Sequence, residues 1–421
     1  MNRLQSIYEE WTDNPYNGEC LYLLGFTIML FRDIMITTMF PISDKVSHIC
    51  LLVALLIILS KILLFDSYSP WMLIVVMGLM GTGVLIVLSS GYIYPFLWLL
   101  LVIGAKDVSF EKIVKIYLIL SISIVGLAFS ASMLGVIENL VYIDGESGAF
   151  RNSFGCAYTT DFAAHIFYII LAIFYIQREK LSWCYYVCTT LVAGLIYYFC
   201  RAKLDTICIL LTVLAFGVYS MYKHQGKKEI KNFRWQVKYQ RLKRLIYKVG
   251  IVIMPVLAIV AFVLTSLYKY SEEETLIMKI DKLSTTRLSM GKRALEKYSL
   301  AIFGQDVPMV GNGGTTKLTK EYFFVDCSYI FVYLRYGIIF LLILFLMYEV
   351  IVHKCIDNTE MFIIVILMSV SSVIDHHLVE GAYNFIGFAL LANIHKQNKF
   401  LQRRKDETKG KDTFGISCNH A

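Results

Sequence analysis

The chain has 421 residues, of which 57% are hydrophobic and only 17% are charged. A typical globular domain is about 45–50% apolar and about 25% charged, so this chain has more apolar side chains than a water-facing surface accommodates. A soluble enzyme, a disordered chain and a disulfide scaffold are therefore excluded. The net charge of +8 fits nucleic acid, anionic lipid or membrane topology equally well, so its position along the chain decides its meaning.

Many apolar runs are long enough to cross a bilayer, which takes about 20 residues in a helix. We therefore expect an all-α polytopic integral membrane protein that forms a single membrane domain over 1–421, with about twelve transmembrane helices. The expected spans are 20–40, 46–65, 70–88, 91–105, 113–136, 158–176, 183–200, 202–222, 249–269, 327–350, 360–375 and 381–394. Glycines and Pro95 interrupt the region 70–105, which forms either a broken helix pair or a re-entrant turn.

The basic residues cluster in two segments. The segment 223–248 has ten Lys and Arg residues against Glu229 alone, and the tail 395–421 has seven against three acidic residues. Cytoplasmic loops are enriched in Lys and Arg, so we expect both segments, and both termini, in the cytoplasm. The positive charge is then a signal of orientation and not a nucleic-acid-binding surface. Two segments follow on the outer side, a loop at 137–157 and a large extracytoplasmic loop at 270–326.

Several arginines fall on this outer side. Arg151 precedes a span, Arg201 follows one directly, and Arg287 and Arg293 lie in the large loop. A guanidinium fork matches phosphate oxygens with two parallel hydrogen bonds. The group as a whole therefore suits a diphosphate, although each arginine alone is better explained as a topology or surface charge.

Two ionisable residues, Arg32 and Asp33, lie inside the first expected span. Adjacent residues diverge by about 100° around a helix, so we do not expect these two side chains to pair with each other. They form either the polar wall of a substrate cavity or an interhelical salt bridge.

Two further groups are candidates for proton transfer. Asp326 stands where the large loop re-enters the membrane, as either a general base or a helix N-cap. His376, His377 and Glu380 lie at the outer turn between the last two expected spans, as either acid–base groups or a hydrated turn. Adjacent histidines do not share one helical face, and we expect no metal site.

Six short motifs follow one another on the expected outer side: Arg151-Asn-Ser-Phe-Gly155, Arg201, Thr286-Arg-Leu288, Leu300-Ala-Ile-Phe-Gly-Gln305, Asp326-Cys-Ser-Tyr329 and Tyr336-Gly-Ile-Ile339. In order and spacing they resemble the Wzy-type polysaccharide polymerases, which are related to O-antigen ligases. The resemblance implies a GT-C-like lipid-dependent glycosyltransferase fold. It also implies transfer of a growing glycan from undecaprenyl diphosphate to the next lipid-linked repeat unit, outside the bacterial cytoplasmic membrane, giving capsule, exopolysaccharide or O-antigen chains.

The resemblance implies roles for particular residues. Arg287 would be catalytic, with Asp326 or His377 as the base. The expected substrate-binding residues are Arg151, Arg201, Arg293, Tyr329, His376 and Glu380. No cofactor is expected, and the expected partners are lipid-linked oligosaccharides, the bilayer, a flippase and a chain-length regulator, with no nucleic acid.

Two alternative functions stay open. Related ligases often have His-Asn before the Tyr of the re-entry segment, whereas Asp326-Cys327 stands here, which favours a polymerase over a ligase. A flippase or transporter of lipid-linked oligosaccharides is the other alternative, suggested by the expected number of spans and by the polar residues of the first span.

Overall fold

The computed structural model describes residues 14–143, 148–228, 233–270, 275–312, 314–316 and 322–394. Its helices are α2 Pro15–Ile36, α3 Asp44–Phe65, α4 Pro70–Ser90, α5 Tyr94–Gly104, α6 Phe110–Met133, α7 Thr159–Ile176, α8 Trp183–Cys200, α9 Lys203–Lys228, α10 Phe233–Leu267, α11 Leu276–Leu283, α12 Arg287–Lys297, α13 Ser328–Arg335, α14 Ile338–Lys354 and α15 Thr359–Ile374, with the 3₁₀ helices η1 His377–Val379 and η2 Ile386–Leu390. The strands β1 Val141–Ile143 and β2 Phe150–Asn152 form an antiparallel hairpin. The basic tail 395–421 lies outside the described residues.

Seven helices in the described part of the chain are long and apolar enough to span a membrane, namely α3, α4, α6, α7, α8, α9 and α10. They coincide with seven of the expected spans and support a mostly helical polytopic membrane protein, in which the short hairpin β1–β2 is the one departure in the described residues from an all-α fold. Within the large loop, α11 and α12 are short helices.

The other five expected spans differ from the prediction. Although α2 is long, it contains three charged residues, Glu19, Arg32 and Asp33, and α5 and α15 have only 11 and 16 residues. The run 327–350 is divided at Gly337 into α13 and α14. The run 381–394 contains no α-helix, only η2 and turns. The expected number of twelve is therefore not reproduced.

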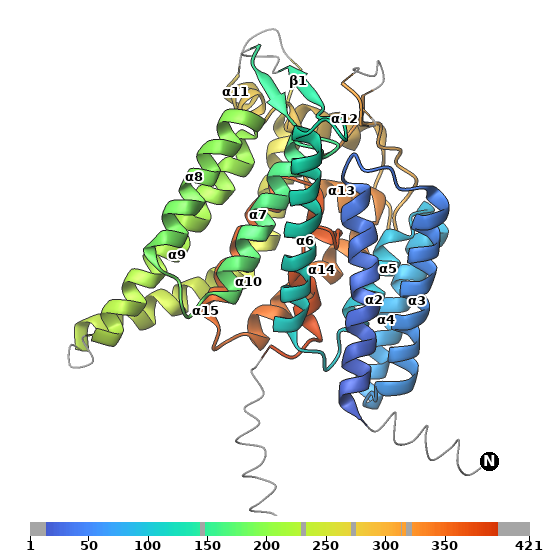
Figure 1. Cartoon of the computed structure of the whole chain (residues 1–421), viewed down its shortest axis with the longest axis vertical. Coiled ribbons are helices and arrows are strands. Elements are labelled where there is room, and N and C mark those ends of the chain that lie inside the picture. Colours follow the sequence, from blue (N-terminus) through green and yellow to red (C-terminus); the bar gives the residue numbers. More distant parts are fainter. Residues whose placement is uncertain are drawn as a thin grey trace, which may run out of the picture.

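The loops gather at two ends of the bundle (Figure 1). The hairpin β1–β2, α11 and α12 lie at one end, called here the hairpin end. At the opposite end, the Ser109 amide donates to Glu19 at 3.0 Å and the Phe110 amide donates to the Asn393 carbonyl at 2.9 Å. The described chain therefore starts and finishes at the same end, to which α9 descends and from which α10 rises, as the predicted sidedness requires.

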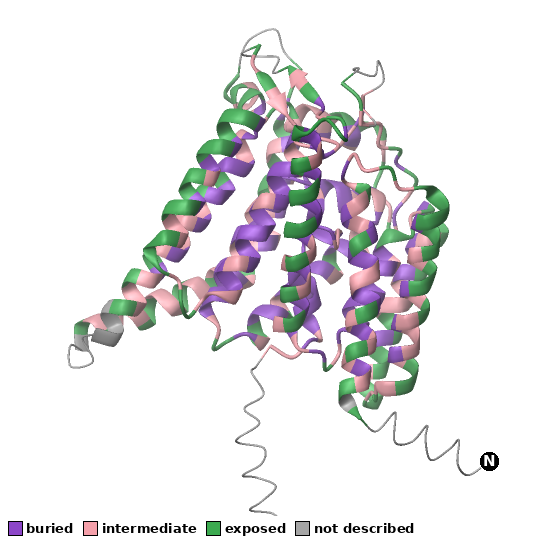
Figure 2. Cartoon of the chain, viewed as in Figure 1, coloured by how far each residue is buried: buried purple, intermediate pink, exposed green. Residues whose placement is uncertain are grey.

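The helices are arranged around a buried middle (Figures 1 and 2). In these views α7, α14 and α15 lie between α2–α5 on one side and α8 and α9 on the other. In the 18-residue apolar stretch of α7, 72% of the residues are buried inside the protein, against 17% in the corresponding stretches of α3 and α4. The helix α7 is therefore central, while α3 and α4 expose apolar side chains on their outer faces, as lipid-facing helices do.

The segment after α15 fills the centre of the bundle. Phe385 packs against Phe110 and Tyr117, and a Cβ at Gly387 would lie 2.3 Å from the Trp98 ring. Irregular backbone at membrane depth is tolerated only where protein buries it. This burial explains why the apolar run 381–394 has the composition of a span without being a helix.

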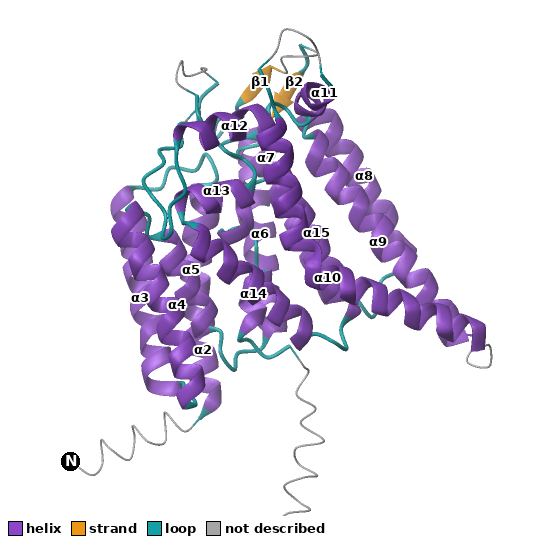
Figure 3. Cartoon of the chain, turned by 180° about the vertical axis from the view of Figure 1, so that it is seen from behind, coloured by secondary structure: helices purple, strands orange, loops and turns teal. Residues whose placement is uncertain are grey.

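Two glycines fix the large loop against the break between α13 and α14. Gly304 and Gly337 both have positive φ, +85° and +91°. A Cβ at Gly337 would lie 2.4 Å from the Ile302 carbonyl oxygen, and the Ile338 amide donates to the Ala301 carbonyl at 3.1 Å. The motifs 300–305 and 336–339 therefore pack against each other. Figure 3 shows the loops of this region at the same end as the hairpin.

Candidate functional site

A pocket at the hairpin end brings together three of the predicted arginines. It is small, with a cavity volume of about 20 Å³, and it is partly open to solvent. Its lining residues are Arg151, Thr160, Arg201, Ala202, Lys203, Leu204, Asp205, Leu283, Thr285 and Arg287. The arginines come from β2, from the turn between α8 and α9, and from α12. We call this feature the arginine pocket.

The local backbone directs Arg151 and Arg201 into this pocket. Arg151 stands opposite Tyr142 in the hairpin, and it donates to the Cys200 carbonyl at 3.2 Å and to the Thr159 hydroxyl at 2.9 Å. Arg201 ends α8 in the left-handed region, with φ of +52°. Its Nε is buried and donates to no group of the described chain, so this guanidinium retains an unused donor.

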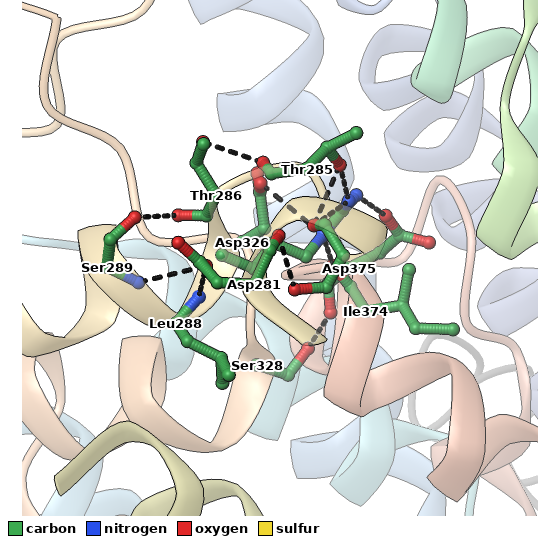
Figure 4. A network of polar contacts seen from close by, with 11 residues as sticks. Asp281, Thr285, Thr286, Leu288, Ser289, Asp326, Ser328, Ile374 and Asp375 are labelled. Atoms are coloured by element: carbon green, nitrogen blue, oxygen red, sulfur yellow. Dashed lines mark hydrogen bonds and ion pairs between the residues drawn. The ribbon is translucent and has the colours of Figure 1, made fainter. Parts of the chain in front are cut away.

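Arg287 begins α12 after a strained turn, and Figure 4 shows Thr285 and Thr286 of that turn beside Asp281. The Asp281 carboxylate accepts hydrogen bonds from the amides of Leu288 at 2.8 Å and Ser289 at 3.1 Å, and so caps the helix from α11. Thr285 and Thr286 have φ of +53° and +63°. Such values are unusual for β-branched residues and cluster at functional sites, which suggests that the turn is retained to orient Arg287.

The Arg287 side chain connects α12 to the segments around α13 and α15. Its Nε donates to the Ile374 carbonyl at 2.7 Å and lies 3.5 Å from Asp326 Oδ2, and its Nη2 lies 3.5 Å from Asp375 Oδ1. Asp375 is 4% exposed and its Oδ2 has no donor in the described chain. The buried carboxyl group of Asp205 faces it. Two adjacent buried carboxyl groups favour sharing one proton.

Asp326 is not the helix cap that the sequence left as its alternative role. The N-cap position of α13 is Cys327, whereas the Asp326 carboxylate faces Arg287 and is 32% exposed. Burial raises the pKa of Asp326, and the charge of Arg287 opposes that shift. The group is thus an ion-pair partner of Arg287 as well as a candidate base.

The histidines correct one sequence argument. His376 and His377 precede and begin a 3₁₀ turn, not an α-helix, so the argument from helical faces does not apply. His377 Nδ1 lies 2.9 Å from Glu380 Oε2, and His376 Nε2 lies 3.4 Å from Glu380 Oε1. The ligating atoms of the three residues lie within 4.8 Å of one another, so this set could hold a metal ion. The expectation of no metal site, which was based on helical faces, therefore does not hold for these residues.

Burial keeps both imidazoles in the neutral form. It lowers the pKa of His376 and of His377 to about 4, although Glu380 opposes the shift at His376 and Asp375 opposes it at His377. A neutral His377 that donates from Nδ1 to Glu380 has its lone pair at Nε2. This is the tautomer of a base oriented by a carboxylate.

A stack of rings fixes the orientation of His377. Tyr383 lies between two imidazoles, with centroid distances of 3.7 Å to His377 and 4.1 Å to His165. The Thr37 hydroxyl contacts His165 Nε2 at 2.8 Å. The stack therefore connects α2, α7 and the segment after α15 directly behind the candidate base.

Two predicted site residues lie elsewhere. Arg293 is exposed on α12, 5.7 Å from the centroid of the Phe323 ring, and is not among the residues lining the arginine pocket. Tyr329 is fully buried and its hydroxyl donates to the Ser369 carbonyl at 2.8 Å. Its position indicates a packing role and leaves no surface for a substrate contact.

Arg32 and Asp33 do pair, contrary to the sequence argument. Arg32 Nη1 lies 2.6 Å from Asp33 Oδ1, and Arg32 Nε donates to the Ser47 hydroxyl at 3.0 Å. The angle between adjacent Cβ directions does not limit a flexible guanidinium, because its length lets it curve around the helix. Asp33 also lies near Glu380, which places it at the edge of the histidine cluster.

No known family model, curated protein or solved structure matches the chain. The arginine pocket and the groups beside it are therefore the features of the molecule that indicate a function.

Proposed function

We propose that the protein is a membrane glycosyltransferase that joins polyprenyl-diphosphate-linked oligosaccharide repeat units into a polysaccharide, as Wzy-type polymerases do. The proposal places a GT-C-like lipid-dependent enzyme in the bacterial cytoplasmic membrane with the reaction on its outer face. One observation carries it most: Arg151, Arg201 and Arg287, from three separate elements, line a single pocket.

The donor diphosphate would lie at the mouth of the arginine pocket, because the cavity of about 20 Å³ has room for little more than one water molecule. Diphosphate oxygens match guanidinium forks, and Arg201 has a buried Nε without a partner in the described chain. Negative charge gathers on the diphosphate as the glycosidic bond breaks, and fixed cations stabilise that charge in the transition state. The leaving group is already activated, so neither a nucleotide sugar nor ATP is required.

His377 is the better candidate for the base. Its Nδ1 is engaged by Glu380 at 2.9 Å, which leaves Nε2 to take the proton of an acceptor hydroxyl. Asp326 instead lies 3.5 Å from Arg287 Nε, and this ion pair engages its carboxylate. We assign Asp326 to holding Arg287 and His377 to proton transfer.

The proposed orientation follows from charge. The basic segment 223–248 lies at the end opposite the arginine pocket, and the excess of Lys and Arg marks the cytoplasmic side. The pocket would then open on the outer side, where the flipped lipid-linked units reside. A ligase would use the same pocket and differ in its acceptor.

Deletion of the gene tests this proposal. We expect single lipid-linked repeat units to accumulate on the outer leaflet and the polymer to disappear, with both effects reversed by the intact gene. Accumulation on the inner leaflet would show a flippase instead. Polymer of normal length in the deletion strain would contradict the proposal, and polymer that forms but stays on its lipid would indicate a ligase.

A further inference from the structure

We infer that Asp33, Arg335, His376 and Glu380 form the subsite for the acceptor sugar, and that this sugar is uncharged. The inference rests on the proposed glycosyl transfer and adds to it the location and chemistry of the second substrate. We call these four residues the acceptor cluster.

The cluster is polar and reachable by water although its elements belong to the helical bundle. Its residues come from α2, from the end of α13 and from the segment after α15. The side chains of Asp33, His376 and Glu380 are 12%, 20% and 33% exposed. Ionisable groups on membrane helices face a cavity or a partner, and partial exposure here favours a water-filled cavity.

The charges of the acceptor cluster are balanced. Asp33 pairs with Arg32 at 2.6 Å, and Arg335 and Glu380 are close enough to influence each other. The arginine pocket is different, because three arginines and Lys203 line it against one carboxylate, Asp205, while Asp326 and Asp375, which pair with Arg287, are not among the lining residues. The pocket thus favours an anion, whereas the acceptor cluster offers paired donors and acceptors for a neutral polyhydroxylated ligand. Asp33 and Glu380 would repel an acidic sugar.

Aromatic rings accompany these polar groups. The Arg335 guanidinium lies 3.5 Å from the centroid of the Tyr92 ring, and the Phe324 ring lies 4.8 Å from that of His376. Arg335 Nε is buried and donates to no group of the described chain. Apolar ring faces beside carboxylates and guanidinium groups match a sugar, which presents C–H groups on its faces and hydroxyls at its edge.

Glu380 connects the cluster to the base. One carboxylate oxygen faces His376 and the other faces His377, while Arg287 and Asp326 are electrostatic neighbours of His377. His377 therefore lies between the two subsites. The acceptor hydroxyl gives its proton to His377 Nε2, and its oxygen forms the new bond to the anomeric carbon of the donor. The bond from that carbon to the diphosphate breaks, and its electron pair leaves with the polyprenyl diphosphate.

Two probes separate this inference from the proposed function. The intact purified chain is titrated with inorganic pyrophosphate, and separately with the oligosaccharide released from the strain's own lipid-linked units. We expect Asp33→Asn and Arg335→Lys to weaken oligosaccharide binding about tenfold or more and to change pyrophosphate binding less than about twofold, since each removes hydrogen bonds from one subsite only. Arg201→Gln should do the reverse, and Asp44→Asn, exposed on α3, should change neither.

Equal oligosaccharide affinity in wild type, Asp33→Asn and Arg335→Lys would overturn the inference, as would wild-type protein that binds pyrophosphate but no oligosaccharide. Failure of wild type to bind pyrophosphate would instead count against the proposed function. The thermal midpoint of each variant distinguishes lost binding from lost folding. Arg335→Lys serves as the second variant because it keeps the charge and removes only the planar fork.

Discussion

At the scale of single residues, the arginine pocket depends on residues whose backbone has a strained, left-handed conformation. Arg201, Thr285 and Thr286 all have positive φ and none is glycine. A left-handed conformation costs roughly 1 kcal/mol or more for such residues. The fold therefore holds these residues against their own conformational preference. The strained backbone at these residues directs the side chains of Arg201 and Arg287 into the arginine pocket.

Arg201→Gln removes the guanidinium with the unused buried donor and keeps a polar side chain. We expect polymer formation to fall about 100-fold, the typical cost of removing one preorganised donor to a developing charge. The control is Arg293→Gln, which removes an exposed arginine outside the pocket lining and should cost less than about twofold. Polymer length and yield are measured at matched membrane levels of the proteins. Equal loss in both variants would mean that the pocket has no special role.

The pH dependence of kcat/KM reports on the base. With the pKa of His377 lowered to about 4, its imidazole is neutral near pH 7 and able to accept a proton. Activity should therefore be flat across neutral pH and fall only as pH approaches the pKa, because protonation occupies Nε2. An acidic limb centred at about 6.5, the value of a solvated histidine, would show that the active base is not this buried ring.

Protonation of the same rings also affects stability. The folded state holds His376 and His377 with pKa values of about 4, below the value of about 6.5 in an unfolded chain. The unfolded chain binds protons first as pH falls, so the free energy of unfolding should decrease between about pH 6.5 and pH 4. His376→Gln should flatten part of that decrease in thermal unfolding measured across this range, and an unchanged slope would contradict the assignment.

At the scale of elements, the contact between the large loop and the break at Gly337 joins two distant motifs. The break separates α13, whose start contacts the segment after α15 through Ser328, from α14. The same contact positions the end of α13, where Arg335 lies. The break in the expected span 327–350 therefore determines where α13 ends and, with it, where Arg335 of the acceptor cluster lies.

Gly337→Ala should destabilise the protein, because its φ of +91° and the 2.4 Å approach to Ile302 leave no room for a Cβ. We expect a loss of more than about 1 kcal/mol and a lower thermal midpoint in detergent. Gly126→Ala is the matched control, since a Cβ there meets nothing within 4 Å, and it should be neutral or slightly stabilising. A thermal midpoint of Gly337→Ala equal to that of wild type would refute this role for the glycine.

At the scale of the whole molecule, the arginine pocket and the junction of α9 with α10 lie at opposite ends of one bundle. Under the proposed function the two positive regions have different roles: the basic residues of 223–248 would orient the protein, and the arginine pocket would bind the donor. The sidedness is tested with a maleimide that does not cross membranes. Ser299→Cys at the hairpin end should react in intact cells, whereas Lys180→Cys, in the turn between α7 and α8, should react only after permeabilisation. The reverse pattern would invert the topology.

Much of the fold was predictable, because lipid as a solvent imposes a strong compositional signal on long helices such as α3 and α10. The run 381–394 was mistaken for a helix since burial by protein and burial by lipid demand the same composition. The convergence of Arg151, Arg201 and Arg287 on one pocket was partly predictable, because the sequence placed all three on the same expected side of the membrane.

Other parts of the site were not predictable. The facing carboxyl groups of Asp205 and Asp375, and the cap that Asp281 places on α12, depend on tertiary contacts or a tight turn with no local pattern. The pairing of Arg32 with Asp33 was missed because side-chain length was not considered. Burial of Tyr329 depends on how α13 packs on α15, which periodicity alone does not specify.

The most direct test of the central claim uses the purified chain in liposomes with polyprenyl-diphosphate-linked repeat units as the only substrate. We expect a ladder of polymers that differ by one repeat unit, release of polyprenyl diphosphate in step with each bond formed, and no requirement for a nucleotide sugar. Arg201→Gln should abolish the ladder while Arg293→Gln keeps it. Unchanged single units after incubation with folded, correctly oriented wild-type protein would contradict the account.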